Sequence, residues 1–252
     1  MLALLCSNAV IPSFTLNIPT HNPRYKPIMQ IPAEVSSRKS IMDEYSDNSV
    51  LIQGGSLRTW SYSSPLIKQV QAVISSEGRP VDADIELWNG PDNTPLKMRV
   101  YVENGRIRPF TCVIDTPRSP NTIAIRNIGQ YEFPMAAKTY INNIDNPTRE
   151  CIACSQTIQG GALRTYPFDT AVQSVEVFIK TDGRPLNARI EVLQGPNNNK
   201  EVIEVYSEDG YDRPFFCILE TPGSGNVVRI VNTAPMEFPI SASALPYYVN
   251  HV

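Results

Sequence analysis

The chain has 252 residues, a formal net charge of −3 and 22 prolines against 13 glycines. So small a net charge predicts neither a nucleic-acid partner nor binding to an anionic membrane surface. No apolar run reaches the roughly 18 residues that a membrane-spanning helix needs, so no membrane span is predicted.

Residues 1–50 form a proline-rich segment without clear hydrophobic periodicity. Prolines at positions 12, 19, 23, 27 and 32 block helices and central strands alike, which predicts an extended arm. Within it, Glu34 to Tyr45 is the stretch that could form a short helix. The arm's apolar residues favour docking on a protein surface, in the same chain or a neighbour, over free solvation. The apolar start, Met1 to Cys6, is short and lacks a basic segment, so it does not predict a signal peptide.

From residue 51 onward the chain contains an internal duplication. The block Gln53-Gly54-Gly55-Ser56-Leu57-Arg58-Thr59 recurs 106 residues later as Gln159-Gly160-Gly161-Ala162-Leu163-Arg164-Thr165. Three further motifs recur at an offset of 105: Gly78-Arg79-Pro80 as Gly183-Arg184-Pro185, Arg108-Pro109-Phe110 as Arg213-Pro214-Phe215, and Glu132-Phe133-Pro134 as Glu237-Phe238-Pro239. This register predicts two homologous domains, repeat 1 (51–145) and repeat 2 (157–245), with a connector (146–156) between them and a tail (246–252).

Both repeats are predicted to be all-β. Runs that broadly alternate apolar and polar residues occur at 69–75, 83–88, 97–102, 110–114 and 122–126, and again at 174–180, 188–193, 202–206, 215–219 and 227–231. Such alternation indicates strands with one buried face. Turn signals such as Asn104-Gly105 separate the runs at a spacing that suits antiparallel hairpins. The predicted fold is therefore two tandem antiparallel β-sandwich-like domains, related by pseudo-two-fold symmetry, with an extended N-terminal arm.

Residues that could carry catalysis are sparse. The two histidines, His21 and His251, lie near the ends of the chain, and no nucleophile, zinc or phosphate-loop pattern is present. We therefore predict no enzyme, no catalytic or metal site and no cofactor.

The cysteines do not form a disulfide framework. Cys112 and Cys217 fall at equivalent positions inside apolar runs and are predicted to be core residues. Cys151 and Cys154 form a single Cys-x-x-Cys before repeat 2. Metal binding, a redox role and a plain connector are the three interpretations of this pair, and the lack of a second ligand pair favours the last.

The Gln-Gly-Gly-x-Leu-Arg-Thr block admits two interpretations. Paired glycines let a backbone approach an anion, but neither a lysine nor a helical pattern follows, which argues against a phosphate loop. The favoured interpretation is that the glycines open each repeat's first strand where another backbone passes closely. Arg58 and Arg164 would then pair inside the chain, with a binding surface as the alternative. The repeated carboxylates available to them are Glu86, Glu191, Glu132 and Glu237.

The aromatic residues also allow two interpretations. Phe110 and Phe215 follow a proline at a strand entrance and are predicted to be core. Trp60, its counterpart Tyr166 and Trp88 could instead form a stacking platform for a sugar, but Leu193 replaces Trp88 in repeat 2, which argues against a duplicated lectin. The structural or interface candidates are thus Gln53, Gly54, Gly55, Arg58, Trp60, Arg79, Arg108 and Phe110, with Gln159, Gly160, Gly161, Arg164, Arg184, Arg213 and Phe215.

The repeated block, the Gly-Arg-Pro turn, the stretch ELWNGPDNTP–KMRVYVENG–RPF and the ending N-x-x-x-x-EFP resemble the pyrenoid shell proteins of diatoms and related algae. The resemblance covers about residues 51–245. It implies a non-enzymatic protein of the chloroplast stroma that assembles with itself into a thin sheet at the pyrenoid periphery. This sheet would enclose the Rubisco matrix and keep CO2 near Rubisco, with Rubisco or other pyrenoid proteins as further partners.

The leading hypothesis is therefore a self-assembling structural protein. An open lattice needs contacts that propagate without closing, and exposed sheet edges and a long arm are devices that supply them. The alternative is a soluble tandem β-sandwich module that binds a carbohydrate or a protein partner without polymerising.

Deletion of residues 1–45 is expected to weaken assembly, because the arm's apolar residues would no longer dock on a neighbouring copy, while both β-repeats stay folded. Negative-stain electron microscopy measures the first effect and circular dichroism the second. An unchanged lattice from the truncated chain would show that the arm is not a connector.

Overall fold

A computed structural model describes residues 49–196 and 198–250. The predicted arm, except its last two residues, and the predicted helix from Glu34 to Tyr45 lie outside this range. The described part is all-β, as predicted, with sixteen strands and one five-residue helix.

The strands of the two repeats correspond one to one. Repeat 1 contains β1 (Val50–Ile52), β2 (Leu57–Tyr62), β3 (Gln69–Ser75), β4 (Val81–Asn89), β5 (Leu96–Val102), β6 (Phe110–Asp115), β7 (Asn121–Asn127) and β8 (Met135–Tyr140). Repeat 2 contains β9 (Gln156–Ile158), β10 (Leu163–Pro167), β11 (Val172–Lys180), β12 (Leu186–Gln194), β13 (Asn199–Ser207), β14 (Phe215–Glu220), β15 (Asn226–Asn232) and β16 (Ile240–Val249).

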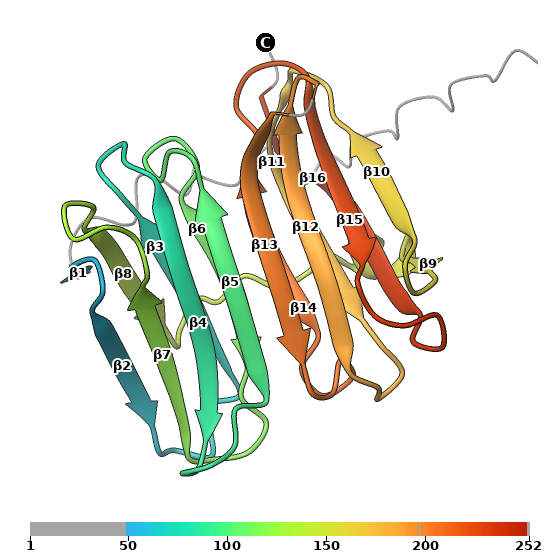
Figure 1. Ribbon diagram of the computed structural model, residues 1–252. Coiled ribbons are helices and arrows are strands. Elements are labelled where there is room, and N and C mark those ends of the chain that lie inside the picture. The colour runs from blue at the N-terminus through green and yellow to red at the C-terminus, as the bar shows by residue number, and fades with distance from the viewer. Residues whose placement is uncertain (1–48, 197, 251–252) are drawn as a thin grey trace, which may run out of the picture. The chain divides into compact units, whose positions relative to one another are not determined.

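These strands build two eight-stranded antiparallel sheets (Figure 1). Sheet I has the order β1-β8-β3-β6-β14-β11-β16-β9, and sheet II has the order β10-β15-β12-β13-β5-β4-β7-β2. Each repeat supplies four strands to each sheet. Both sheets therefore run without interruption from one repeat into the other.

The repeats meet at a seam of two strand pairs, β5–β13 in sheet II and β6–β14 in sheet I. Arg99 is the Cα partner of Glu204, and Cys112 is that of Cys217. In both pairs the second residue lies 105 positions after the first, which is the offset of the duplication. Equivalent residues oppose each other only where a two-fold axis passes between them. The predicted pseudo-two-fold axis is thus confirmed, and it crosses both sheets at the seam.

The core lies between the sheets and follows the period-two pattern. In β5, buried Leu96, Met98, Val100 and Val102 alternate with exposed residues, because successive side chains of a strand point to opposite faces. All ten strands expected from this pattern are present, with ends that differ by no more than three residues.

The other strands carried weaker signals in the sequence. β1 and β9 have three residues each, which is too short to display a period. The Gln-Gly-Gly block was expected to open each repeat's first strand, but it forms the turn between the first and second strands of each repeat. The first and second strands of each repeat lie in different sheets and are joined by this single turn. The segment therefore contains no long apolar run that a sequence pattern could reveal.

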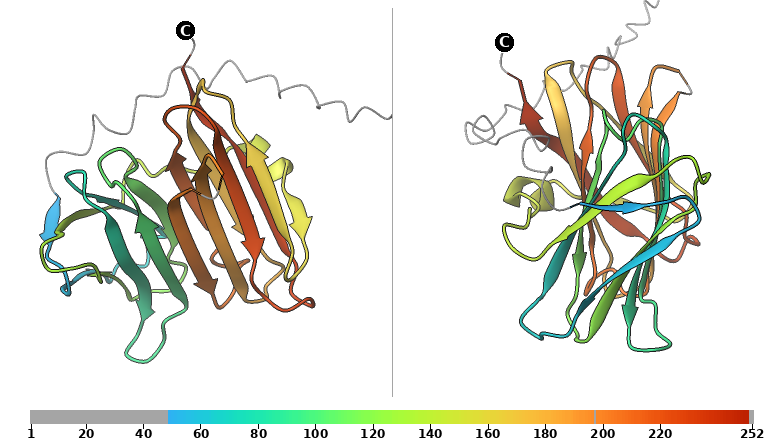
Figure 2. Two further views of the ribbon diagram at one scale, coloured as in Figure 1. Left: turned by 45° about the horizontal axis from the view of Figure 1, so that its top comes forward. Right: turned by 90° about the vertical axis from the view of Figure 1, so that its left-hand side faces the viewer.

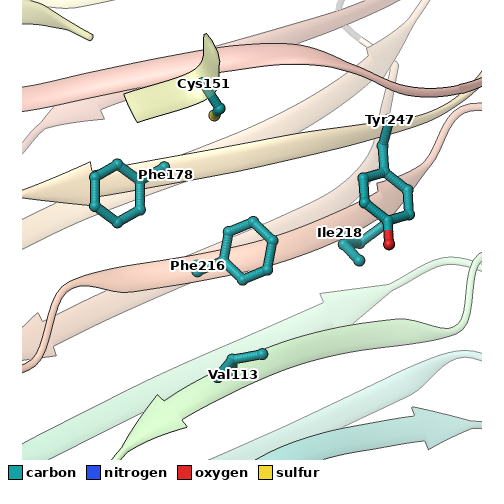
Figure 3. Close-up of a cluster of buried hydrophobic side chains, with 6 residues drawn as sticks. All are labelled: Val113, Cys151, Phe178, Phe216, Ile218 and Tyr247. Atoms are coloured by element: carbon teal, nitrogen blue, oxygen red, sulfur yellow. The ribbon is translucent and has the colours of Figure 1, made fainter. Parts of the chain in front are cut away.

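The connector lies on the outer face of sheet I. Its helix α1 (Arg149–Ala153) is capped by Thr148, whose Oγ1 accepts a hydrogen bond from the backbone N–H of Cys151. The helix packs on β11 and β16, outside the double sheet (Figure 2). It covers part of an apolar cluster (Figure 3), formed by Val113, Cys151, Phe178, Phe216, Ile218 and Tyr247.

Polar contacts anchor this connector to both repeats. Asp145 accepts a hydrogen bond from Gln71 Nε2 of repeat 1 (2.7 Å) and another from the Tyr247 hydroxyl of repeat 2 (2.8 Å). Glu176 of repeat 2 accepts from the backbone N–H of Thr148 (3.0 Å). The two stacked sheets form a slab, and the connector is a strap that crosses the seam on one side of this slab only.

Substitution of Ile203 by Ala is expected to destabilise the molecule by about 2–5 kcal/mol, because Ile203 is fully buried on seam strand β13. Unfolding in denaturant should remain a single transition, since both repeats share their sheets. Val202→Ala, on the opposite face of the same strand, serves as the control and should change stability by less than about 1 kcal/mol. Two separate transitions would show that the repeats unfold independently.

Candidate functional site

The Gln-Gly-Gly turns are places where two backbone segments cross. A Cβ atom on Gly54 would lie 2.0 Å from the carbonyl oxygen of Gln130, and one on Gly160 would lie 1.9 Å from that of Pro235. Gly55 and Gly161 both have φ +77°, a left-handed conformation that favours glycine. Another backbone segment therefore passes close to each turn. This is the interpretation that the sequence favoured over an anion site.

A buried asparagine completes each crossing. Asn127 Nδ2 donates to the carbonyl oxygens of Ile52 (3.0 Å) and Phe133 (2.8 Å), and its Oδ1 accepts from the backbone N–H of Gly129 (2.9 Å). Asn232 repeats this pattern in repeat 2. Sequence reasoning did not assign these residues a role, although Asn127 opens the repeated ending N-x-x-x-x-EFP.

The repeated Gly-Arg-Pro and Glu-Phe-Pro motifs meet at the same end of each repeat. The Arg79 guanidinium lies 5.5 Å from the centre of the Phe133 ring, and that of Arg184 lies 5.7 Å from the Phe238 ring. These are cation–π contacts. The two motifs lie far apart in the sequence but form the same corner of the sandwich in each repeat, which is why both of them recur.

The repeated arginines Arg58 and Arg164 lie on the outermost strands of sheet II, β2 and β10. Arg164 Nη1 donates to the side-chain amide oxygen of Gln156, where we had expected a carboxylate. The carboxylate of Glu191 instead pairs with Arg229 and, at 2.8 Å, with Arg189. Both candidate arginines thus stand at sheet edges.

The tryptophans do not gather into a stacking platform. Trp60 is the Cα partner of Ile123, and Trp88 is that of Thr122. Because Ile123 and Thr122 are adjacent in β7, the two tryptophans lie on opposite faces of sheet II. Trp88 also donates to Glu86 Oε2 on its own strand (2.7 Å).

The predicted core phenylalanines, Phe110 and Phe215, are buried, and so are the arginines that precede them. Arg108 reaches from repeat 1 into repeat 2, where its Nη2 donates to Gln194 Oε1 (3.0 Å). Glu201 lies near it and is 1% exposed. Neither Arg108 Nε nor Glu201 Oε1 has a hydrogen-bond partner among the described residues.

Arg108 and Glu201 lie at one end of the seam, and burial governs the protonation of the carboxyl groups there. It raises the pKa of Glu201 to about 8, against the opposing effect of the Arg108 charge. It also raises the pKa of Glu220 to about 7, again with Arg108 opposing. The two carboxyl groups thus surround one buried guanidinium where the repeats join.

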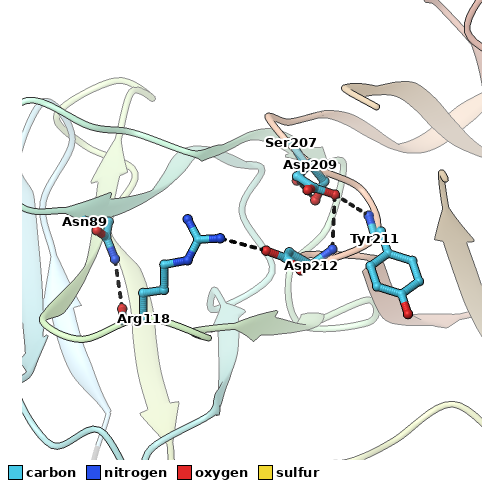
Figure 4. Close-up of polar contacts among 6 residues, drawn as sticks. All are labelled: Asn89, Arg118, Ser207, Asp209, Tyr211 and Asp212. Carbon is cyan, nitrogen blue, oxygen red and sulfur yellow. Dashed lines mark hydrogen bonds and ion pairs between the residues drawn. The ribbon is translucent and has the colours of Figure 1, made fainter. Parts of the chain in front are cut away.

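The other end of the seam has an apolar residue at one position where this end has a buried carboxyl group. Leu96 takes the place of Glu201, and Arg213, the counterpart of Arg108, is buried. Here the repeats are joined by an ion pair between Arg118 Nη2 and Asp212 Oδ2 at 3.1 Å (Figure 4). Its side chains are 71% and 34% exposed, so it contributes little to stability.

Three of the cysteines, Cys112, Cys151 and Cys217, are buried. Cys112 and Cys217 are fully buried, and burial raises the pKa of both thiols, which keeps them protonated. Burial also raises the pKa of Cys151 to about 12, and its Sγ lies 3.2 Å from Ser243 Oγ. Within residues 49–196 and 198–250, no three His, Cys, Asp or Glu side chains are grouped as a metal site requires.

Within the part of the chain that the structure describes, the double sheet ends in unpaired strand edges on both sides. One end presents β1 and β2, and the other presents β9 and β10. Leu51 on β1 is 57% exposed and Leu163 on β10 is 54% exposed. A groove of about 650 Å³ lies along β9 and β10, lined among others by Ile158 and Tyr166. Of the described residues, none belongs to a helix with the length and hydropathy of a membrane span.

The stability of the protein is expected to fall as pH rises from about 5 to 8. Because Glu201 and Glu220 have raised pKa values in the folded state, the folded chain binds more protons than the unfolded chain across this interval, and linkage then lowers the free energy of unfolding as pH increases. E201L, which installs the residue found at the equivalent position 96, should flatten this slope, because it removes a carboxyl group that binds a proton in the folded state across this interval. Denaturant titrations at several pH values measure both effects, with E208Q, an exposed carboxylate, as the control. An unchanged slope in E201L would contradict the assignment.

Comparison with known proteins identifies the family. No match was found among curated proteins. The family model of the diatom pyrenoid shell protein matches residues 43–246, which contain both repeats and the strap. The chain therefore belongs to the diatom pyrenoid shell protein family.

Proposed function

We propose that the chain is a structural subunit that assembles with itself into a thin sheet around the Rubisco-containing pyrenoid. The sheet lies at the pyrenoid periphery in the chloroplast stroma and supports CO2 fixation by keeping CO2 near Rubisco. Family membership supports a role in a pyrenoid shell. The role of the subunit is architectural, and it needs neither a catalytic site nor a cofactor.

The observation that carries this proposal is the pair of open ends of one continuous double sheet. Each end offers two strands, one from each sheet, whose outer N–H and C=O groups pair with no other strand of residues 49–196 and 198–250. Such edges are templates for pairing with another chain unless charge or proline blocks them. The edge strands of sheet I, β1 and β9, carry neither charge nor proline, whereas Arg58, Arg164 and Pro167 lie on the edge strands of sheet II. Exposed Leu51 on β1 and Leu163 on β10 add an apolar side chain at each end.

The pseudo-two-fold axis also supports growth without closure. It relates β1 to β9 and β2 to β10, so the equivalent edge strands run in opposite directions at the two ends. A neighbour displaced by simple translation then brings β9 of one copy antiparallel to β1 of the next, and β10 antiparallel to β2. This contact joins different surfaces of the two copies, and repetition by translation extends it indefinitely.

L51K/L163K is expected to abolish sheets while leaving the fold intact. The substitutions place a positive charge on an edge strand at each end, which is how natural proteins prevent edge pairing. Negative-stain electron microscopy of the purified full chain measures the outcome, and circular dichroism confirms folding.

The matched control is V202K, since Lys97 already occupies the equivalent position in repeat 1. It adds one lysine to the outer face of sheet II and should still form sheets. Sheets from L51K/L163K would overturn the edge contact. A wild-type chain that stays monomeric at high concentration, with its arm intact, would overturn self-assembly and favour the binding-module alternative.

A further inference from the structure

The outer face of sheet II carries a row of alternating charges across the seam. Arg189, Glu204, Arg99 and Asp84 are successive Cα partners on β12, β13, β5 and β4, the middle strands of the sheet that lies in front in Figure 1. We call these four residues the charge row. The side chains of Arg189, Glu204 and Arg99 are 40%, 55% and 58% exposed, respectively. The row lines a groove of about 550 Å³.

The pseudo-two-fold axis reverses every sign in the charge row. Position 84 is equivalent to position 189, and position 99 to position 204, so each acid in one repeat corresponds to an arginine in the other. Rotation of the row end for end therefore superimposes each charge on its opposite. A surface with this property is complementary in charge to a copy of itself.

We infer that a second copy of this chain docks on the outer face of sheet II, with a two-fold axis that runs between the copies and parallel to the strands. This axis lays one charge row over the other in reverse order. Arg189 then faces Asp84 of the second copy, and Glu204 faces Arg99 of the second copy. All four positions of the row meet an opposite charge.

The charge row also excludes the other face-to-face arrangement. A two-fold axis perpendicular to the strands would lay the row over itself in the same order, so that Arg99 faced Arg99 and Glu204 faced Glu204. Like charges in direct opposition are unfavourable and suppress wrong pairings. The row therefore selects one orientation.

The neighbouring rows of the same face mostly agree with this orientation. It brings Val202 over Tyr101 of the second copy, and Lys97 over the ring of Tyr206 of the second copy, because these positions are also exchanged by the axis. The two tyrosines are 39% and 38% exposed. Glu191 would face an acid at position 82, but it is already neutralised by its two arginine partners.

The opposite face of the slab has no such property. The strap lies on the outer face of sheet I, over repeat 2, and breaks the two-fold symmetry there. Pairing through sheet II uses neither β1, β2, β9 nor β10. It therefore goes beyond the proposed edge-to-edge sheet and would join two such sheets into a double layer.

Charge reversal in the edge-blocked chain L51K/L163K tests this inference. Sedimentation equilibrium at about 0.1 M salt, where the Debye length is about 10 Å, should show a dimer that weakens as salt is added. E204R or R99E alone should weaken dimerisation by about tenfold, because each puts like charges opposite each other twice per dimer. R99E/E204R should restore it, since the doubly exchanged row is again complementary to its own reverse.

The decisive sample is an equimolar mixture of the E204R and R99E chains. The arginine introduced at position 204 of one chain then faces the glutamate introduced at position 99 of the other, so the mixture should form a heterodimer as tight as the unsubstituted dimer. Restored attraction between positions 99 and 204 within one chain cannot produce this result, because each chain in the mixture keeps its own like-charged pair at these positions. A monomeric edge-blocked chain, or a mixture that associates no better than its components, would overturn the inference. Sheet formation by the wild-type chain is judged separately by electron microscopy, so failure of either idea leaves the other standing.

Discussion

Backbone hydrogen bonding between equivalent strands of the two repeats is the interaction on which the rest of this structure depends. In each sheet one strand of repeat 1 pairs with its own counterpart in repeat 2, β5 with β13 and β6 with β14. Antiparallel pairing of equivalent strands requires a local two-fold axis. As a result, the two repeats form one slab of two eight-stranded sheets instead of two separate small sandwiches.

This pairing decides which surfaces remain available. The seam strands are interior, so the unpaired edges are moved to the far ends of the slab, where the first two strands of each repeat lie. The same axis makes the two ends equivalent but oppositely directed. The slab also has two unlike faces, because the strap, which is the connector that contains α1, is present once and covers sheet I only.

The repeats have diverged at one of the two positions that the axis brings together and where the strap lies, whereas Cys112 and Cys217 on the axis are identical. Phe216 lies in the apolar cluster beside the strap, whereas its counterpart Thr111 does not. Glu201 in β13 corresponds to Leu96 in β5, so a buried carboxyl group at one end of the seam has an apolar counterpart at the other. On the axis itself, Arg99 opposes Glu204, whereas identical repeats would have opposed two like charges. Divergence at these positions favours pairing of repeat 1 with repeat 2 over pairing of two copies of the same repeat.

What the sequence determined by itself is local and periodic. The alternation in 97–102 and its nine companion runs predicted the strands, because burial of one face imposes a period of two on each strand. The recurrence of Gln-Gly-Gly-x-Leu-Arg-Thr predicted the duplication, and the glycine pairs predicted a close backbone crossing. Only the tertiary structure decided that β5 pairs with β13, that Arg108 and Glu201 are buried together, and that the charges at 84, 99, 189 and 204 form one row. These relations pair residues up to 111 positions apart, as Leu96 with Ser207, and strand register between distant segments is set by backbone hydrogen bonds and packing that leave no period in the sequence.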